Sequence, residues 1–327
     1  MQQRVGTALW VAVACACAIH VPHALAQWQP TRPIRIIIPF PAGGPSDVMM
    51  RMVAHSMQPR LGQGFVIENR AGAGGTTGTR AAALVEPDGY TLLVANTATL
   101  LINPMIQSRL EYDPETSFAP VGFMATSSNV LLIHAAIPAR TVKELVAWAR
   151  ERPGQLSYST PGVGTPAHLI GELFKVRTGL DLAHVPYKGG GISVQDVVKG
   201  DVQLTFENPA TALPIIETGG VRAIAVTGSA RSPQLPDVAT MVESGLDDFV
   251  TESFFGIVTR AGTPAAIVET MSRALVESLQ EAEIQAAFAR LSLVVRTGTP
   301  AEFAAYIARE RQRWAAIAKA ANIKIGP

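Results

Sequence analysis

The sequence predicts an α/β fold with largely parallel sheets covered by helices. Short apolar or β-branched runs alternate with helical patterns through nearly the whole chain, which is the order produced when helices connect parallel strands. Several runs, such as 34–38 and 223–226, are apolar along most of their length, as in strands covered on both faces. With 327 residues, of which 48% are hydrophobic and 16% charged, the chain is long enough for about two domains.

Apolar runs place the expected strands and helices along the chain. Strands are expected at 34–40, 65–69, 91–95, 130–134, 156–159, 183–186, 202–206, 223–227 and 254–258. Helices are expected near 47–60, 75–85, 142–151, 167–177, 192–199 and 211–218, with a last helix at about 300–321. The last helix is expected to pack on a core, because one stripe of it carries Phe303, Tyr306, Ile307, Trp314 and Ile317.

Four helix starts carry recognisable capping signals. Residues 141–144 and 299–302 both have the Thr-x-x-Glu pattern of a capping box. Thr165 and Thr263 each precede a proline, which predicts a threonine cap followed by proline at the first helical position.

Residues 1–26 have the pattern of a cleavable signal peptide. Arg4 precedes an apolar run at 5–19, and residues 24–26 (Ala-Leu-Ala) fit a small-x-small cleavage site. We therefore expect an exported, periplasmic protein. Removing this segment removes both cysteines and leaves 26 basic residues, the 27 of the chain less Arg4, against 26 acidic ones. The exported part then has no thiol chemistry, and its zero net charge argues against a nucleic-acid partner.

Three segments share one design, in which a strand runs into a glycine-rich turn and then into a helix start. They are residues 39–47, 159–166 and 186–191. Glycine lets the backbone approach a ligand closely, and a helix start adds unpaired N–H groups and about half a positive charge. Each turn could therefore hold a carboxylate without a formal cation. The alternative is that these turns only reverse the chain.

Few side chains in the turns are charged, and no catalytic pattern is present. Lys188 is the only base there and could face a ligand or solvent, while Asp47, the only acid, could contact a ligand or simply favour the helix dipole. His-Glu-x-x-His and Gly-x-Ser-x-Gly are absent, and the histidines after the expected signal peptide (His55, His134, His168 and His184) never pair at helical spacing. We therefore expect no catalytic residue, metal site or cofactor. Residues 72–78 have the wrong spacing for a dinucleotide loop and are interpreted as a turn feeding a helix.

Taken in order, these segments resemble the tripartite tricarboxylate transporter solute receptors, also called the Bug family. The motifs are PIR at 33–35, PFPAGG at 39–44, ENRAGAGG at 68–75, PDGYTLL at 87–93, YDP at 112–114, KEL at 143–145, GVGT at 162–165 with His168-Leu169, HVPYKG at 184–189, GTP at 262–264 and the last helix with Trp314. The ordered set spans essentially the whole exported chain.

The resemblance implies a type II periplasmic-binding-protein fold. Such a fold has two lobes of mixed, mostly parallel sheets flanked by helices, with a ligand cleft between lobes that close like a flytrap. We expect a signal peptide at 1–26, lobe 1 at 27–125 plus 230–327, and lobe 2 at 126–229. The implied function is a monomeric receptor that captures a small carboxylate and delivers it to the membrane subunits of a tripartite tricarboxylate-type transporter. The alternatives are a ligand-presenting accessory of a membrane sensor kinase and an exported hydrolase.

The resemblance also implies which residues contact the ligand, which could be a mono-, di- or tricarboxylate, an aromatic acid or an amino acid. In lobe 1 they are Phe40, Ala42, Gly43, Gly44, Ser46 and Asp47, with Asn96 and Thr97. In lobe 2 they are Thr160, Gly162, Thr165, His168, Tyr187, Lys188 and Gly189, and Asn208 lies near the crossover. Three departures from the family pattern fall on or near the cleft. Pro45 removes an amide donor, Glu207 stands before Asn208 where Asp is common, and Phe254-Phe255 replaces a usual Trp-Phe.

Overall fold

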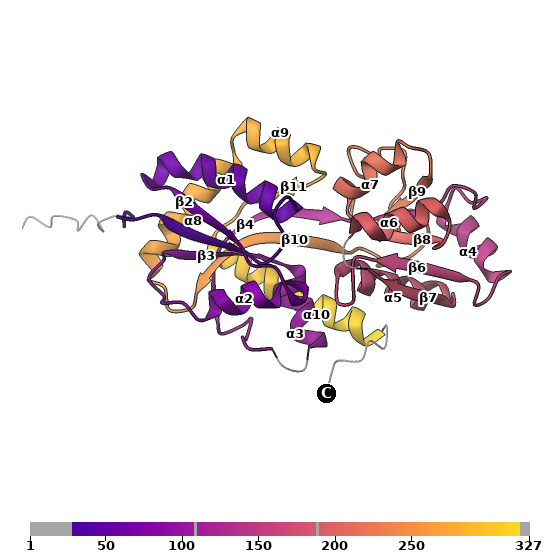
Figure 1. Cartoon of the computed structure of the whole chain (residues 1–327), viewed down its shortest axis with the longest axis horizontal. Coiled ribbons are helices and arrows are strands. Elements are labelled where there is room, and N and C mark those ends of the chain that lie inside the picture. The colour runs from indigo at the N-terminus through magenta and orange to yellow at the C-terminus, as the bar shows by residue number, and fades with distance from the viewer. Residues whose placement is uncertain (1–27, 108–109, 188–189, 321–327) are drawn as a thin grey trace, which may run out of the picture.

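The computed structural model describes residues 28–107, 110–187 and 190–320. The expected signal peptide at 1–26 and two predicted site residues, Lys188 and Gly189, lie outside the described residues. Two sheets, each flanked by helices, follow one another along the long axis of the molecule (Figure 1). The α/β class with mixed sheets is therefore confirmed, although antiparallel pairs are as prominent as parallel ones.

The first sheet has six strands in the order β11-β4-β10-β3-β1-β2. These are β1 (Ile34–Ile38), β2 (Phe65–Asn69), β3 (Thr91–Asn96), β4 (Phe118–Ser128), β10 (Glu252–Arg260) and β11 (Val294–Val295). Strands β2 and β3 run parallel to β1, whereas β10 is antiparallel to its neighbours β3 and β4. Its helices are α1 (Pro45–Leu61), α2 (Thr76–Ala83), α3 (Asn103–Ile106), α8 (Ala265–Leu279) and α9 (Ala282–Arg290).

The second sheet has five strands in the order β7-β6-β8-β5-β9. These are β5 (Val130–His134), β6 (Leu156–Thr160), β7 (Leu182–Pro186), β8 (Leu204–Glu207) and β9 (Val221–Val226). Strand β6 runs parallel to β7 and β8, so the carboxyl ends of these three strands meet at one edge of the sheet. The helices are α4 (Val142–Arg150), α5 (Pro166–Thr178), α6 (Gly190–Lys199) and α7 (Pro209–Ile216).

Three of the four predicted threonine caps are confirmed. The hydroxyls of Thr141, Thr165 and Thr299 accept the N–H of the residue three positions later. The expectation for Thr263 is wrong. Pro264 takes the cap position without a side-chain hydrogen bond, and the Thr263 hydroxyl instead donates to the Arg260 carbonyl at 2.7 Å.

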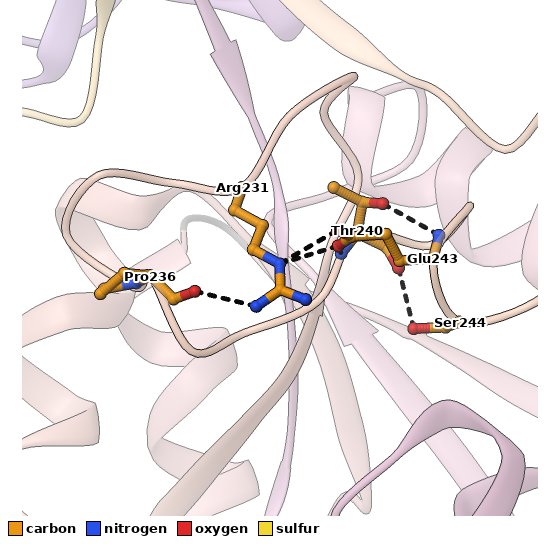
Figure 2. Close-up of polar contacts among 5 residues, drawn as sticks. All are labelled: Arg231, Pro236, Thr240, Glu243 and Ser244. Carbon is orange, nitrogen blue, oxygen red and sulfur yellow. Dashed lines mark hydrogen bonds and ion pairs between the residues drawn. The ribbon is translucent and has the colours of Figure 1, made fainter.

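The chain passes between the sheets at two places. Strand β4 leads into β5 through Asn129 alone, so this crossing lies in extended chain. The return from β9 to β10 uses residues 227–251, which polar side chains hold together (Figure 2). Arg231 pairs with Glu243 at 2.9 Å and donates to the Pro236 carbonyl, while Glu243 accepts the Thr240 N–H at 2.7 Å.

One apolar core continues from the first sheet into the second. It contains Ile37 of β1 and Leu131 of β5 together with the buried face of α10 (Pro300–Ala320). Helix α10 packs on both β4 and α5, which confirms the predicted apolar stripe and places this helix across the junction of the sheets. No helix among the described residues combines the length and the apolar character needed to cross a membrane.

Candidate functional site

Two of the predicted turns have the same backbone conformation, although they belong to different sheets. One joins β1 to α1 and the other joins β6 to α5. Gly43 and Gly164 have φ values of +78° and +79°, a region that favours glycine. The following residues, Gly44 and Thr165, are extended helix caps with φ of −75° and −78°, and each precedes a proline. The two sheets therefore present one turn design twice.

A side chain from the first helical turn holds each glycine in place. The Gly43 N–H donates to Oδ2 of Asp47 at 2.9 Å, and the Gly164 N–H donates to Nδ1 of His168 at 3.3 Å. Both acceptors lie four residues after their glycine. Asp47 and His168, which we expected as ligand contacts, therefore fix the shape of the two turns.

At two corresponding positions, each turn also has an N–H group for which the described part of the chain supplies no partner. They belong to Ala42 and Ser46 in the first turn and to Val163 and Ala167 in the second. These groups lie at helix N-termini, where the helix dipole adds about half a positive charge. An anion placed against either turn would accept hydrogen bonds without needing a formal cation.

The charge of Asp47 is balanced inside the first half of the molecule. Asp47 is 4% exposed, and its carboxylate accepts hydrogen bonds from Arg51 at 3.0 Å and from Nδ2 of Asn69 at 3.1 Å. The hydrogen bond from Arg51 is the main cause that holds the pKa of Asp47 below its usual value. Asn69 also donates to the carbonyl of Phe40 at 3.1 Å, so it ties the beginning of the turn to its end.

A stack of three rings, from His168, His184 and Tyr158, packs beside the second turn. The ring centroids of His168 and His184 are 4.3 Å apart, and Tyr158 stacks on His184 at 4.9 Å. Because Nδ1 of His168 accepts the Gly164 N–H, that nitrogen carries no proton. Burial lowers the pKa of His168, and burial followed by the proximity of His168 lowers the pKa of His184 to about 4. Both imidazoles are therefore neutral at neutral pH.

Thr160 and Tyr187, expected as ligand contacts, use their polar side chains inside the second half. Thr160 is fully buried, with its hydroxyl 2.8 Å from Nε2 of His184 and 3.2 Å from the Gly162 carbonyl. The Tyr187 hydroxyl donates to Asp196 at 2.6 Å, and this hydrogen bond is the main reason that the pKa of Tyr187 rises to about 12. The Tyr187 N–H donates to the Thr160 carbonyl at 2.9 Å, which keeps the third turn beside the second.

Asn96 and Thr97 are likewise engaged within the fold. The Thr97 side chain is fully buried and accepts the Phe254 N–H at 2.8 Å, which ties the end of β3 to β10. Oδ1 of Asn96 accepts the Thr99 N–H at 3.1 Å. Asn208 caps α7 by accepting the Ala210 N–H, and its Nδ2 donates to the Ser127 hydroxyl of β4 at 3.1 Å. Asn208 therefore connects the two sheets.

The second turn touches the first half of the molecule at Gly164. A Cβ atom at this position would lie 2.2 Å from Cδ1 of Ile106 and 3.9 Å from Oδ1 of Asn103, both on α3. A side chain at this position would have to displace the end of the Ile106 side chain. This close approach shows that the two halves are drawn together here.

The contact continues from α3 to the first turn. Nδ2 of Asn103 donates to the Gly74 carbonyl at 2.9 Å, and a Cβ at the next residue, Gly75, would lie 3.1 Å from the Phe40 ring. Residues 72–75 are therefore more than a turn feeding a helix. The glycines of this segment were the signal in the sequence that the backbone comes close to another part of the chain here. Nothing in the sequence marks Asn103 or Ile106 as neighbours of the turns.

We call the junction of the two sheets, where Gly164 meets α3, the seam. Other notable features of the described surface lie away from it. No group of three or more metal-ligating side chains occurs in residues 28–107, 110–187 and 190–320. Two hollows, of about 560 and 380 Å³, lie between α8 and the start of α10 and between α1 and α9. Neither is lined by the glycine-rich turns.

Comparisons with known proteins agree with this architecture. A family model described as the tripartite tricarboxylate transporter family receptor matches residues 49–323. R. palustris Rpa4515, solved with adipate, is 32% identical and has a TM-score of 0.83, with coverage of 90% of this chain and 98% of that one. The periplasmic binding protein BugD is 32% identical with a TM-score of 0.80, over 90% and 99% of the two chains. MatC (Rpa3494) from Rhodopseudomonas palustris, with bound malate, is 28% identical with a TM-score of 0.78, over 88% and 99%.

The histidine stack predicts an unusual proton titration. Imidazole NMR signals of His168 and His184 should titrate below the usual pKa of 6.5, with the midpoint of His184 near pH 4. His168→Gln removes a neighbouring charge but leaves much of the burial, so the His184 midpoint should rise while staying below 6.5. Unfolding restores normal pKa values, so the free energy of unfolding should fall as pH drops from about 6.5 to 4. A His184 midpoint unchanged by His168→Gln would contradict the stacked arrangement.

Proposed function

The chain belongs to the tripartite tricarboxylate transporter family of receptors, and from this premise we propose that it captures a small organic acid between its two sheets and delivers it to the membrane subunits of a tripartite transporter. The family consists of binding proteins rather than enzymes, so the hydrolase alternative is dropped. The receptor works in the periplasm, as a monomer, after removal of the signal peptide at 1–26.

The observation that carries this proposal is the duplicated turn at the seam between the sheets. Each copy connects the end of a parallel strand to the start of a helix. At two corresponding positions, each copy has an N–H group without a protein partner in the described chain. The two copies are connected through Gly164, α3 and Phe40. A carboxylate held at this seam would accept hydrogen bonds from N–H groups of both halves and would stabilise their closure.

The chemistry of the turns favours a carboxylate. Ala42 and Ser46 would donate from the first half, together with the Ser46 hydroxyl, and Val163 and Ala167 would donate from the second. The charge of Asp47 is offset by Arg51, so it does not repel the ligand strongly. Relatives solved with adipate and with malate make dicarboxylates the first class to test.

We further propose that the two halves move as lobes, with lobe 1 formed by 27–125 plus 230–327 and lobe 2 by 126–229. Both chain crossings, through Asn129 and through residues 227–251, are places where such a movement could bend the chain. Each lobe carries one copy of the turn. Opening would separate the two half-sites, and a ligand that bridges them shifts the population toward the closed form.

A thermal-shift screen against mono-, di- and tricarboxylates, aromatic acids and amino acids tests the function. A ligand present at about 100 times its dissociation constant should add about 2.7 kcal/mol to the free energy of unfolding. We expect adipate, malate or another dicarboxylate to raise the melting temperature and to be recovered unchanged. Stabilisation by none of the acids, or turnover of the stabilising compound, would contradict the proposal.

The contact at Gly164 gives a mutational test with a matched control. Gly164→Ala should reduce ligand-induced stabilisation, because the new Cβ would have to displace the end of the Ile106 side chain when the halves close. Gly179→Ala has a similar positive φ, +68°, but no atom within 4 Å of the new Cβ, so it should cost about 1 kcal/mol of stability and leave binding intact. Adding Ile106→Ala to Gly164→Ala should restore part of the binding. Equal binding by both single variants would show that closure at Gly164 is not needed.

A further inference from the structure

Glu207 is a buried acid at the junction of the two sheets. It is the last residue of β8, and β8 lies beside β6, whose end leads into the second turn. The next residue, Asn208, donates a hydrogen bond to Ser127 of the first sheet. Glu207 therefore lies where the sheets would begin to separate.

The carboxyl group of Glu207 is poorly supplied with partners. The residue is 3% exposed, and its Oε1 accepts the N–H of Asn208 at 2.9 Å. Its Oε2 is buried and has no hydrogen-bond partner among the described residues. Leaving a buried carboxylate without a partner is costly, so the neutral, protonated form is favoured here.

The elements packed around Glu207 bring no balancing charge in the described chain. Phe206 packs against Phe174 of α5, so by strand alternation Glu207 lies on the opposite face, toward α6. Strand β5 places Val130 opposite Glu207. The charged residues of α6, Asp196 and Lys199, pair with each other at 2.8 Å.

The charged groups nearest the seam in the other sheet also have their own partners. Strand β10 begins with Glu252, which accepts hydrogen bonds from the N–H and hydroxyl of Ser229. Helix α7 begins directly after Glu207 and contributes the uncharged Asn208 and Pro209. Burial, opposed only by the hydrogen bond from the Asn208 N–H, raises the pKa of Glu207 to about 7.

We propose that Glu207 takes up one proton from solvent when the two sheets close and releases it when they separate, so that acid favours the closed form. The inference rests on the closing movement of the proposed function. Separation at the Asn208–Ser127 contact would admit water to the end of β8, and a hydrated glutamate returns to its usual pKa of about 4.5. Closure and proton uptake are then linked at one residue.

The linkage has a defined sign and size. The pKa of Glu207 is near 7 in the closed form and near 4.5 in the open form, so between these pH values only the closed form is mostly protonated. Lowering the pH through this window therefore favours closure. The closing equilibrium should change by up to about 10-fold per pH unit there, and by about 40-fold in all between pH 7 and pH 5, because the group is half titrated near pH 7. Above pH 8 the dependence should vanish.

Small-angle X-ray scattering of the ligand-free protein at pH 8.5 and pH 5.0, at constant ionic strength, tests this proposal. The wild-type radius of gyration should be smaller at pH 5.0. Glu207→Gln imitates the neutral acid and should stay compact at both pH values. Glu207→Met, also neutral and of similar length, should behave as Glu207→Gln does and covers the case in which one variant fails to fold, as judged by circular dichroism.

Glu310→Gln is the matched control. Glu310 is also buried with a raised pKa, but it lies on α10 within 3.8 Å of Arg313, so this variant should follow the wild type. A wild-type radius that does not change with pH, or neutral Glu207 variants that expand as the wild type does, would overturn the proposal. Because no ligand is present, such a result would leave the carboxylate screen untouched, and a negative screen would leave the scattering result standing.

Discussion

The N–H groups near the starts of α1 and α5 that have no partner in the described chain are the constraint on which the proposed site depends. They become available because a parallel strand ends, a glycine turns the chain through positive φ, and a proline begins the helix. Parallel strands bring such turns to one edge of each sheet. The second turn approaches α3 of the first half at Gly164, and α3 in turn contacts the segment that packs on Phe40 of the first turn.

The two copies of the turn use different side chains to accept the N–H of the glycine with positive φ. In the first, Asp47 accepts the glycine N–H as a carboxylate, and Arg51 balances its charge. In the second, His168 accepts it as a neutral imidazole that stacks on His184. Among the described residues, neither of these two turns therefore carries a strong unbalanced charge. In the proposed function, the anion is therefore held by backbone dipoles rather than by a formal cation.

Much of the fold and part of the site could be predicted from local sequence. Apolar runs located most strands, Thr-x-x-Glu patterns located helix starts, and glycine before proline located both copies of the turn. Strand β4 escaped because Pro120 and Gly122 interrupt its apolar pattern. The roles of Ile106 and Thr97 escaped because contact and burial there arise from tertiary packing. The glycines of the seam were visible, but not which surface would approach them.

Backbone NMR during titration with adipate tests the central claim most directly, because it observes the N–H groups themselves. The amide protons of Ser46 and Ala167 should both move downfield together as the acid is added, since each would gain a hydrogen bond to an anion. The amides at the start of α4, which is capped by Thr141, should not respond. Saturating adipate binding that shifts the amides of only one turn, or only residues beside the hollow between α8 and α10, would contradict the account.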